Sequence, residues 1–176
     1  MKNQLRKISL QKRKELNVEK LSEKVLNNLF SLKEYKNANN ILAYYPLKYE
    51  IQTQKCFEDD CKTWYLPRVK EENLEVCPYN KTLLSCGSFK IQEPTNEKIQ
   101  DLSIIDVVII PAVAADKNGY RIGYGKGFYD RFLKNLNSKC KKIILVYSEC
   151  LYENVSPNEF DVKADVIVTD KEIFRF

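Results

Sequence analysis

Residues 105–133, IDVVIIPAVAADKNGYRIGYGKGFYDRFL, decide how we interpret the fold of this 176-residue chain. The stretch begins with an apolar run typical of a buried strand and continues through a polar loop. Three glycines then stand at alternate positions, Gly123, Gly125 and Gly127. An amphipathic helix is predicted to follow, because large apolar residues recur there at four-residue spacing. The order of strand, glycine loop and helix start is typical of a place where the backbone approaches an anion closely.

The charged residues beside these glycines suit a phosphate group. Arg121 and Lys126 bring two positive charges to the loop, and unpaired backbone N–H groups add partial positive charge. Asp130, predicted in the first helical turn, has the opposite sign. A carboxylate next to phosphate is reasonable if a Mg²⁺ ion lies between them. We therefore interpret the stretch as a site for a metal-bound nucleotide.

A less specific interpretation of the same stretch remains open. The spacing Gly-x-Gly-x-Gly is neither the dinucleotide fingerprint nor the Walker pattern. An ordinary strand-to-helix turn would also use glycines, and Asp130 would then simply be an acid favoured near a helix start. However, the chain has only five glycines, and three of them fall within five residues. This concentration favours a site.

The remaining sequence predicts an α/β fold. We expect helices at residues 2–15, 18–31 and 53–60, with a link at 33–40 and a polar loop around Gly87 and Pro94. We expect strands at residues 41–45, 63–66, 74–78, 107–110, 143–147 and 166–168. Apolar strands that alternate with helices predict a mostly parallel sheet covered on both faces, a three-layer α/β/α arrangement. The length favours one domain over residues 1–176.

Several segments together resemble the 5-formyltetrahydrofolate cyclo-ligase (5,10-methenyltetrahydrofolate synthetase) family. The signature stretch is PAVAAD at 111–116 followed by GYRIGYGKGFYD at 119–130. Further similar segments are the basic N-terminal helix, YP at 45–46 with EIQT at 50–53, LPR at 66–68, GSFKIQEP at 87–94 and FDVKAD at 160–165. Departures from the family pattern are Ala112, Ala115, Phe128 and Phe160. None of them removes a charged group.

The resemblance implies roles for particular residues. ATP contacts would come from Lys2, Arg6, Arg121, Gly123, Tyr124, Gly125, Lys126, Gly127, Phe128 and Tyr129. Folate contacts would come from Tyr45, Glu50, Tyr124, Gly125, Lys126, Gly127 and Phe128. Asp130 and Asp161 would bind Mg²⁺, and Lys126 and Arg121 would be catalytic. The residues alone favour a solvated basic face for the N-terminal helix; the resemblance changes that for Lys2 and Arg6 but not for Arg13.

The activity that the resemblance implies is ATP- and Mg²⁺-dependent conversion of 5-formyltetrahydrofolate to 5,10-methenyltetrahydrofolate, with release of ADP and phosphate. The γ-phosphoryl group would pass to the formyl oxygen, and N10 would attack the resulting iminium phosphate. The partners would be these two small molecules. No nucleic acid, no membrane and a monomeric state are expected.

Composition is consistent with this interpretation. The net charge of +5 favours anionic partners such as ATP and folate. The chain has no histidine, which excludes Ser-His and Cys-His nucleophiles and mixed zinc sites. The six cysteines form no C-x-x-C pair, and we expect them to be reduced and structural. The charged N-terminus and the lack of an apolar run of about 18 residues predict a cytoplasmic protein.

Two other classes remain open. A sugar-phosphate isomerase or acyl-CoA transferase could use a similar loop for phosphate, but it would not need Lys2, Arg6 and the pair Asp130 and Asp161. A non-enzymatic folate-binding or RNA-binding protein is the second alternative. Salt-sensitive RNA binding or folate binding without turnover would support that second class.

Overall fold

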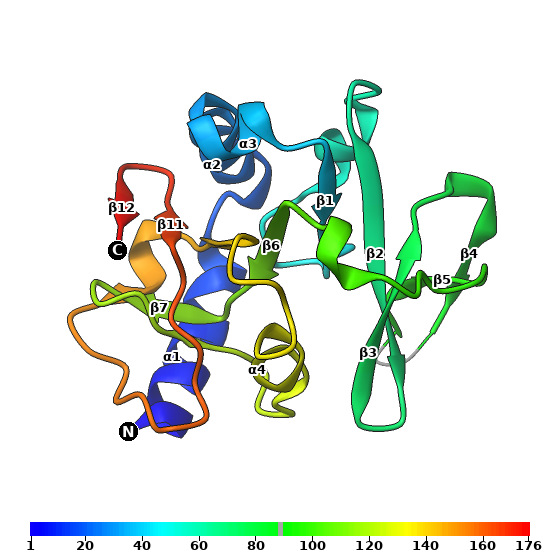
Figure 1. Cartoon of the computed structure of the whole chain (residues 1–176). Coiled ribbons are helices and arrows are strands. Elements are labelled where there is room, and N and C mark those ends of the chain that lie inside the picture. Colours follow the sequence, from blue (N-terminus) through cyan, green and yellow to red (C-terminus); the bar gives the residue numbers. More distant parts are fainter. Residues whose placement is uncertain (88–89) are drawn as a thin grey trace.

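The computed structural model describes residues 1–87 and 90–176, and its main feature is a seven-stranded sheet with the strand order β12-β11-β9-β6-β1-β2-β3 (Figure 1). Ser88 and Phe89, which belong to the segment 87–94 noted above, lie outside the described residues. The strands are β1 (Asn40–Leu42), β2 (Thr63–Lys70), β3 (Asn73–Pro78), β6 (Val107–Pro111), β9 (Lys141–Leu145), β11 (Val166–Val168) and β12 (Ile173–Arg175).

The five strands from β2 to β11 pair in parallel, as the alternation of strands and helices predicts. Both edge strands are antiparallel: β3 returns along β2, and β12 returns along β11. The sequence reasoning did not foresee these two reversals. They follow from short connections, because a parallel neighbour needs a crossover of a dozen residues or more. Only Glu71 and Glu72 separate β2 from β3, and Glu71 adopts a positive φ of 55°.

Helices lie on both faces of this sheet, so the predicted three-layer arrangement is confirmed. One face packs against α2 (Val18–Ser31) and α3 (Lys33–Asn37) through the cluster that includes Leu26, Leu29 and Tyr35. The other face packs against α4 (Phe128–Leu133) through Phe132 and Leu133. In the view of Figure 1, α2 and α3 lie together at the top, whereas α4 lies at the bottom beside the β2–β3 hairpin.

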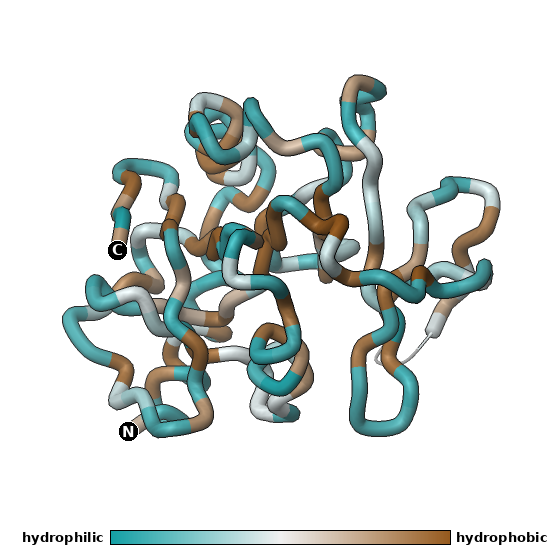
Figure 2. Tube along the Cα trace, in the orientation of Figure 1, coloured by the Kyte–Doolittle hydropathy of each residue, from teal (hydrophilic) through white to brown (hydrophobic). Residues whose placement is uncertain are grey.

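The hydropathy of the residues follows the same layered arrangement of sheet and helices. Figure 2 shows the most hydrophobic residues in the middle of the molecule, where the strands lie, and a hydrophilic end on the β2–β3 hairpin. Strands β6 and β11 are buried almost completely, which is the pattern of parallel strands covered on both faces. Trp64 and Tyr65 of β2 are buried as well.

Two small sheets complete the described structure. A three-stranded sheet has the order β10-β7-β8, with β7 (Ala114–Asp116), β8 (Arg121–Ile122) and β10 (Leu151–Tyr152). A two-stranded sheet pairs β4 (Leu84–Cys86) with β5 (Gln92–Pro94) in the region predicted as a polar loop. The remaining short helices are of the 3-10 type: η1 (Gln54–Glu58), η2 (Lys81–Leu83), η4 (Leu102–Ile104) and η5 (Ser148–Cys150).

Some predicted elements differ in extent. Helix α1 (Lys2–Glu15) and helix α2 agree with their predictions, but the predicted link 33–40 contains α3. The helix predicted at 53–60 is the 3-10 helix η1. Helix α4 ends at Leu133, so Leu136 lies beyond its end although it still packs on the core. The chain leaves the helix through a turn in which Asn137 accepts the backbone N–H of Lys139 at 2.9 Å.

Two further observations concern surface and core. Cys56, Cys77, Cys140 and Cys150 are buried as free thiols, whereas Cys61 and Cys86 are exposed. None of the helices in the described ranges combines the length and apolar character that crossing a membrane requires.

Candidate active site

A cavity of about 710 Å³ opens beside α1, the glycine loop, α4 and the β2–β3 hairpin. Strands β1 and β6 lead into it, since Tyr44 follows β1 and Pro111 ends β6. This is the carboxyl edge of the parallel strands, where ligands bind in sheets of this kind. Every residue assigned above to ATP, folate or metal lines this cavity: Lys2, Arg6, Tyr45, Glu50, Arg121, Gly123, Tyr124, Gly125, Lys126, Gly127, Phe128, Tyr129, Asp130 and Asp161.

The glycine loop, residues 123–127, has a backbone conformation that favours glycine over residues with a Cβ atom. Gly125 and Gly127 have positive φ angles of 97° and 69°, which residues with a Cβ atom rarely adopt. A Cβ atom at Gly127 would lie only 2.9 Å from a guanidinium nitrogen of Arg131. A Cβ atom at Gly125 would be 3.5 Å from the guanidinium carbon of Arg6, which itself donates to the carbonyl of Gly123 at 2.7 Å. The loop therefore favours glycine at these two positions, and the guanidinium group of Arg6 lies close to it.

The helix after this loop contributes less than the sequence suggests. Helix α4 has six residues, with Gly127 as its N-cap and Asp130 in its first turn. So short a helix carries a small dipole, because the dipole is the sum over aligned peptide groups. Any attraction for anions here comes mainly from the loop N–H groups and from the cationic side chains.

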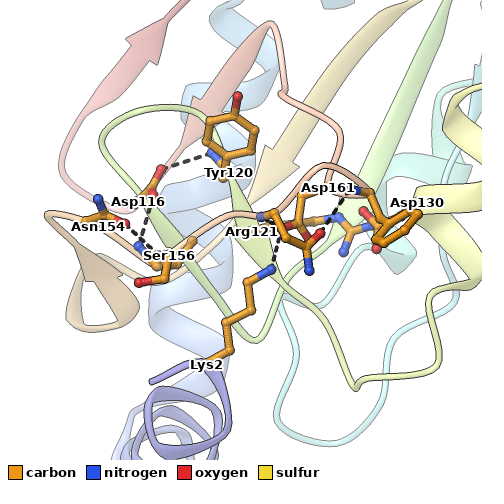
Figure 3. A network of polar contacts seen from close by, with 11 residues as sticks. Lys2, Asp116, Tyr120, Arg121, Asp130, Asn154, Ser156 and Asp161 are labelled. Carbon is orange, nitrogen blue, oxygen red and sulfur yellow. Dashed lines mark hydrogen bonds and ion pairs between the residues drawn. The ribbon is translucent and has the colours of Figure 1, made fainter.

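Two cations and two carboxylates of the cavity are paired with one another. Figure 3 shows Lys2 reaching from α1 to Asp161, and Arg121 lying against Asp130. The Arg121 Nη2 atom is 3.0 Å from Oδ1 of Asp130, and Lys2 Nζ forms an ion pair with Oδ2 of Asp161. The approach of Asp161, which the sequence alone could not establish, is thus supplied by the segment 154–161 folding back over the start of α1.

A buried carboxylate fixes the two segments that carry these residues. Asp116 is completely buried, and its Oδ1 accepts the backbone N–H groups of Asn118 and Tyr120 at 3.0 Å (Figure 3). Its Oδ2 accepts the N–H of Val155 at 3.0 Å. Asp116 therefore holds the turn before Arg121 and the segment before Asp161 in fixed relation.

Two polar groups in the cavity wall have no hydrogen-bond partner among the described residues. They are Nε of Arg121, whose side chain is 5% exposed, and the hydroxyl of Tyr129. Buried polar groups are normally satisfied, so unpaired donors beside a cavity indicate where a ligand would supply the missing acceptors. Both residues were predicted to contact ATP.

Glu50 is a buried acid that also lines the cavity. Its side chain is 5% exposed, and Oε2 accepts the backbone N–H of Leu47 at 2.7 Å. Burial raises the pKa of Glu50, while the Leu47 N–H, the charge of Arg13 and the nearby Tyr124 hydroxyl oppose that rise. Such a carboxylate can accept hydrogen bonds from N–H groups of a ligand in a site with little water.

The two acids assigned to metal fit Mg²⁺ only together with ligand oxygens. In the described part of the chain, no three acidic or cysteine side chains cluster as a metal cage. Mg²⁺ is commonly bound by one or two carboxylates together with substrate phosphates and water. Asp130 and Asp161 line the cavity, and Oδ2 of Asp130 and Oδ1 of Asp161 have no hydrogen-bond partner among the described residues, so each carboxylate has a free oxygen.

Sequence reasoning missed other residues of the cavity. Arg131 of α4 and Lys134 just after it line the cavity, as does Phe160, which is 64% exposed and whose ring centroid lies 5.3 Å from Nζ of Lys134. Arg13, expected on a solvated basic face, is 1% exposed and lies beneath the site. The spacing of Lys2, Arg6 and Arg13 places all three on one stripe of α1, so it gave no signal that separates the buried Arg13 from the two residues that line the cavity.

The fold and this cavity define a class: an α/β protein with an anion-binding glycine loop, several cations and two free carboxylate oxygens in one pocket. Comparison with known proteins gives the family. Residues 1–170 match the model of the 5-formyltetrahydrofolate cyclo-ligase family, and the chain belongs to that family. The predicted enzyme class, a cyclo-ligase, is confirmed at this level.

Individual relatives cover nearly the whole chain. The NMR structure of 5,10-methenyltetrahydrofolate synthetase from Aquifex aeolicus is 36% identical, with a TM-score of 0.87 over 99% of this chain and 92% of that one. The 5-formyltetrahydrofolate cyclo-ligases of Mycoplasma genitalium and Mycoplasma pneumoniae are each 32% identical. They align over 95% and 97% of this chain, and over 96% and 99% of their own lengths.

Proposed function

We propose that this protein converts 5-formyltetrahydrofolate to 5,10-methenyltetrahydrofolate, using ATP and Mg²⁺ and releasing ADP and phosphate. Family membership supports the overall conversion. The observation that carries the ATP-dependent form is the joint placement of Lys2, Arg6, the glycine loop and two carboxylates around one cavity with Glu50. An isomerase or a CoA transferase needs no such combination.

The proposed reaction requires activation of a poor electrophile, the formyl carbon. A formamide carbon resists attack and its oxygen is a poor leaving group. Transfer of the γ-phosphoryl group to the formyl oxygen gives an iminium phosphate, which N10 attacks, and phosphate leaves as the ring closes. Phosphoryl transfer depends mainly on positioning and charge neutralisation. Lys126, Arg121 and the loop N–H groups supply both in this proposal, and no general base is obligatory.

The two substrates would enter from opposite sides of the cavity. Lys2 and Arg6 on α1 lie next to the glycine loop, which suits the triphosphate. Glu50 and Tyr45 lie beyond strand β1 and would face the pterin ring, with the carboxylate accepting its N–H groups. The apolar residues Pro67, Val69 and Leu74 of the hairpin form a wall suited to the remainder of the folate.

Asp130 and Asp161 would hold the Mg²⁺ ion. When bound, this ion neutralises phosphate charge during transfer. The protein's own contribution is to keep Asp130 next to Arg121, and Asp161 next to Lys2, so that cations and metal ligands surround the same phosphate region.

An absorbance assay for methenyltetrahydrofolate formation tests the proposal, with ATP and Mg²⁺ each omitted in turn. We expect product only when both are present, together with one phosphate for each product formed. Phosphate release independent of 5-formyltetrahydrofolate would favour another phosphate-using enzyme. Folate binding without turnover would favour the non-enzymatic alternative.

We further propose that the chain acts as one domain and as a monomer. All the residues assigned to the two substrates and the metal come from one chain, so the cavity needs no partner copy. Light scattering during size-exclusion chromatography should give about the mass of one chain. An obligate dimer that loses activity on dilution would contradict this.

A further inference from the structure

Arg13 is a buried cation with no role in the site as described so far. Its side chain is 1% exposed, and its Nη2 atom donates to the carbonyl of Ala112 just after β6. Its Nε and Nη1 atoms have no hydrogen-bond partner within the described ranges, and no carboxylate there lies within salt-bridge distance of it. A buried charge without a partner is costly, so its presence calls for a compensating interaction.

The surroundings of Arg13 lead to Glu50. The guanidinium lies 5.7 Å from the ring centroid of Tyr147, just after β9. The Tyr147 hydroxyl in turn donates to the backbone carbonyl of Glu50 at 2.9 Å. Arg13, Tyr147 and Glu50 therefore form a continuous buried path from α1 to the segment that carries the proposed folate contact.

Glu50 and Arg13 carry opposite charges, and Arg121 brings another positive charge close to Tyr129 in the same region. The Tyr124 hydroxyl also acts on Glu50, and the charge of Glu50 in turn acts on four tyrosines from different elements, Tyr44, Tyr124, Tyr129 and Tyr147. Burial raises the pKa of each of these tyrosines, so all four are neutral at physiological pH. Charge–charge attraction across a few buried side chains is stronger than in water, because the local dielectric is low.

We propose that Arg13 is a positioning residue for folate binding: although it does not line the cavity, its positive charge acts along the buried path through Tyr147 and favours the carboxylate form of Glu50, which accepts the hydrogen bonds of the pterin. This inference rests on the proposed function. Tyr124, whose hydroxyl lies within the influence of both charges, connects the pair to the glycine loop. Arg13 would thus act on the folate side of the site although it shares a helix stripe with two ATP residues.

The direction of the pH effect follows from the charges. Burial raises the pKa of Glu50, and the positive charge of Arg13 lowers it. Without Arg13 the carboxyl group would stay protonated to a higher pH and would lose an acceptor for folate. The acid limb of kcat/KM for 5-formyltetrahydrofolate should therefore move to higher pH when the charge is removed.

The test is a double-mutant cycle between Arg13→Met and Glu50→Gln in the full chain. Methionine keeps much of the apolar stem of arginine and removes its charge. We expect Arg13→Met alone to raise the KM for 5-formyltetrahydrofolate at least tenfold near pH 7.5, with kcat changed less than threefold and the KM for ATP less than twofold. In the Glu50→Gln background the same change should add less than a factor of two.

Lys14→Met is the matched control, because it removes one charge from an exposed neighbouring position on the same helix. It should leave both KM values and the pH profile unchanged. Equal effects of Arg13→Met in both backgrounds, or an unmoved acid limb, would overturn the inference and leave Arg13 as a packing residue.

A variant that does not fold and a parent protein without turnover are distinguished by different measurements. If Arg13→Met does not fold, Arg13→Lys decides, since it keeps the charge: a folate KM within threefold of the parent supports the inference, and a tenfold rise opposes it. If the parent binds 5-formyltetrahydrofolate without turnover, the proposed function fails, and the same cycle is measured on the folate Kd by calorimetry.

Discussion

Arg121 and Asp130 face each other across the start of the glycine loop, with Nη2 and Oδ1 3.0 Å apart. One was predicted to neutralise phosphate and the other to bind metal. Lys2 and Asp161 repeat the arrangement on the neighbouring wall. Arg121 and Lys2 are thus each paired with a proposed metal ligand, and binding of a metal-bound nucleotide would replace both ion pairs with cation–phosphate and carboxylate–metal contacts.

Replacement of either acid should affect turnover far more than stability. We expect Asp130→Asn and Asp161→Asn each to lower kcat at least a hundredfold at limiting Mg²⁺. Ion pairs with partly exposed members contribute about 1 kcal/mol or less, so unfolding should change little. Steady-state rates across a Mg²⁺ titration check the first point, and thermal unfolding checks the second.

Glu159→Gln is the control for this pair, because Glu159 is exposed, lies two residues before Asp161 and does not line the cavity. Its Mg²⁺ dependence should equal that of the parent. Near-normal turnover of Asp161→Asn at limiting Mg²⁺ would remove this residue from the metal site.

The glycine loop should not tolerate a branched side chain at Gly125. Its φ of 97° strains any residue with a Cβ atom, and the added atoms would also fill the space between the loop and Arg6. We expect Gly125→Val to weaken ATP binding at least tenfold, measured by calorimetry. A folded variant that binds ATP as tightly as the parent would mean that the loop is an ordinary turn.

Arg6 and Glu50 should separate the two substrates kinetically. A group that contacts one substrate equally in the ground and transition states changes that substrate's KM with little change in kcat. Arg6→Ala should therefore mainly raise the KM for ATP, and Glu50→Gln the KM for 5-formyltetrahydrofolate, each about tenfold. Initial rates with one substrate varied at a time measure both, and the reverse pattern would exchange the two substrate positions.

Arg131 connects two walls of the cavity and should affect both substrates. Its Nε and Nη2 atoms donate to the carbonyl of Glu72 at the hairpin turn, at 3.1 and 2.6 Å. Its Nη1 atom donates to the carbonyl of Lys126 in the glycine loop at 3.1 Å. We expect Arg131→Ala to raise both KM values several-fold and to cost about 1 to 3 kcal/mol of unfolding free energy. A rise in the KM for only one substrate, with unchanged stability, would assign Arg131 to that substrate alone.

Sequence reasoning succeeded where a periodic pattern or a motif specified the structure. Helices α1 and α2 have apolar residues at helical spacing, and strand β6 is a continuous apolar run. The predicted bounds of all three agree closely with the observed ones. The small strands β7, β8 and β10 escaped prediction because two or three residues carry no period. They exist because neighbouring backbone segments pair with them.

In the cavity, too, some features could be predicted from the sequence and others could not. The motif segments predicted a set of residues, and the fold brings that whole set to one place. Arg13 shows what a helical stripe cannot reveal: Lys2, Arg6 and Arg13 look equivalent in sequence, yet the first two reach the cavity and the third is buried beneath it. The difference depends on the residues just after β6 and β9, because Arg13 contacts Ala112 and Tyr147 there.

The ion pair between Lys2 and Asp161 joins residues that are 159 positions apart in the chain. During synthesis, Lys2 is made well before Asp161. Helix α1 must therefore remain without this partner until the strands β1, β2, β3, β6 and β9 have been made. Nascent chains that stop before Asp161 cannot close this wall of the cavity, so catalytic competence should arise abruptly during synthesis rather than grow with chain length.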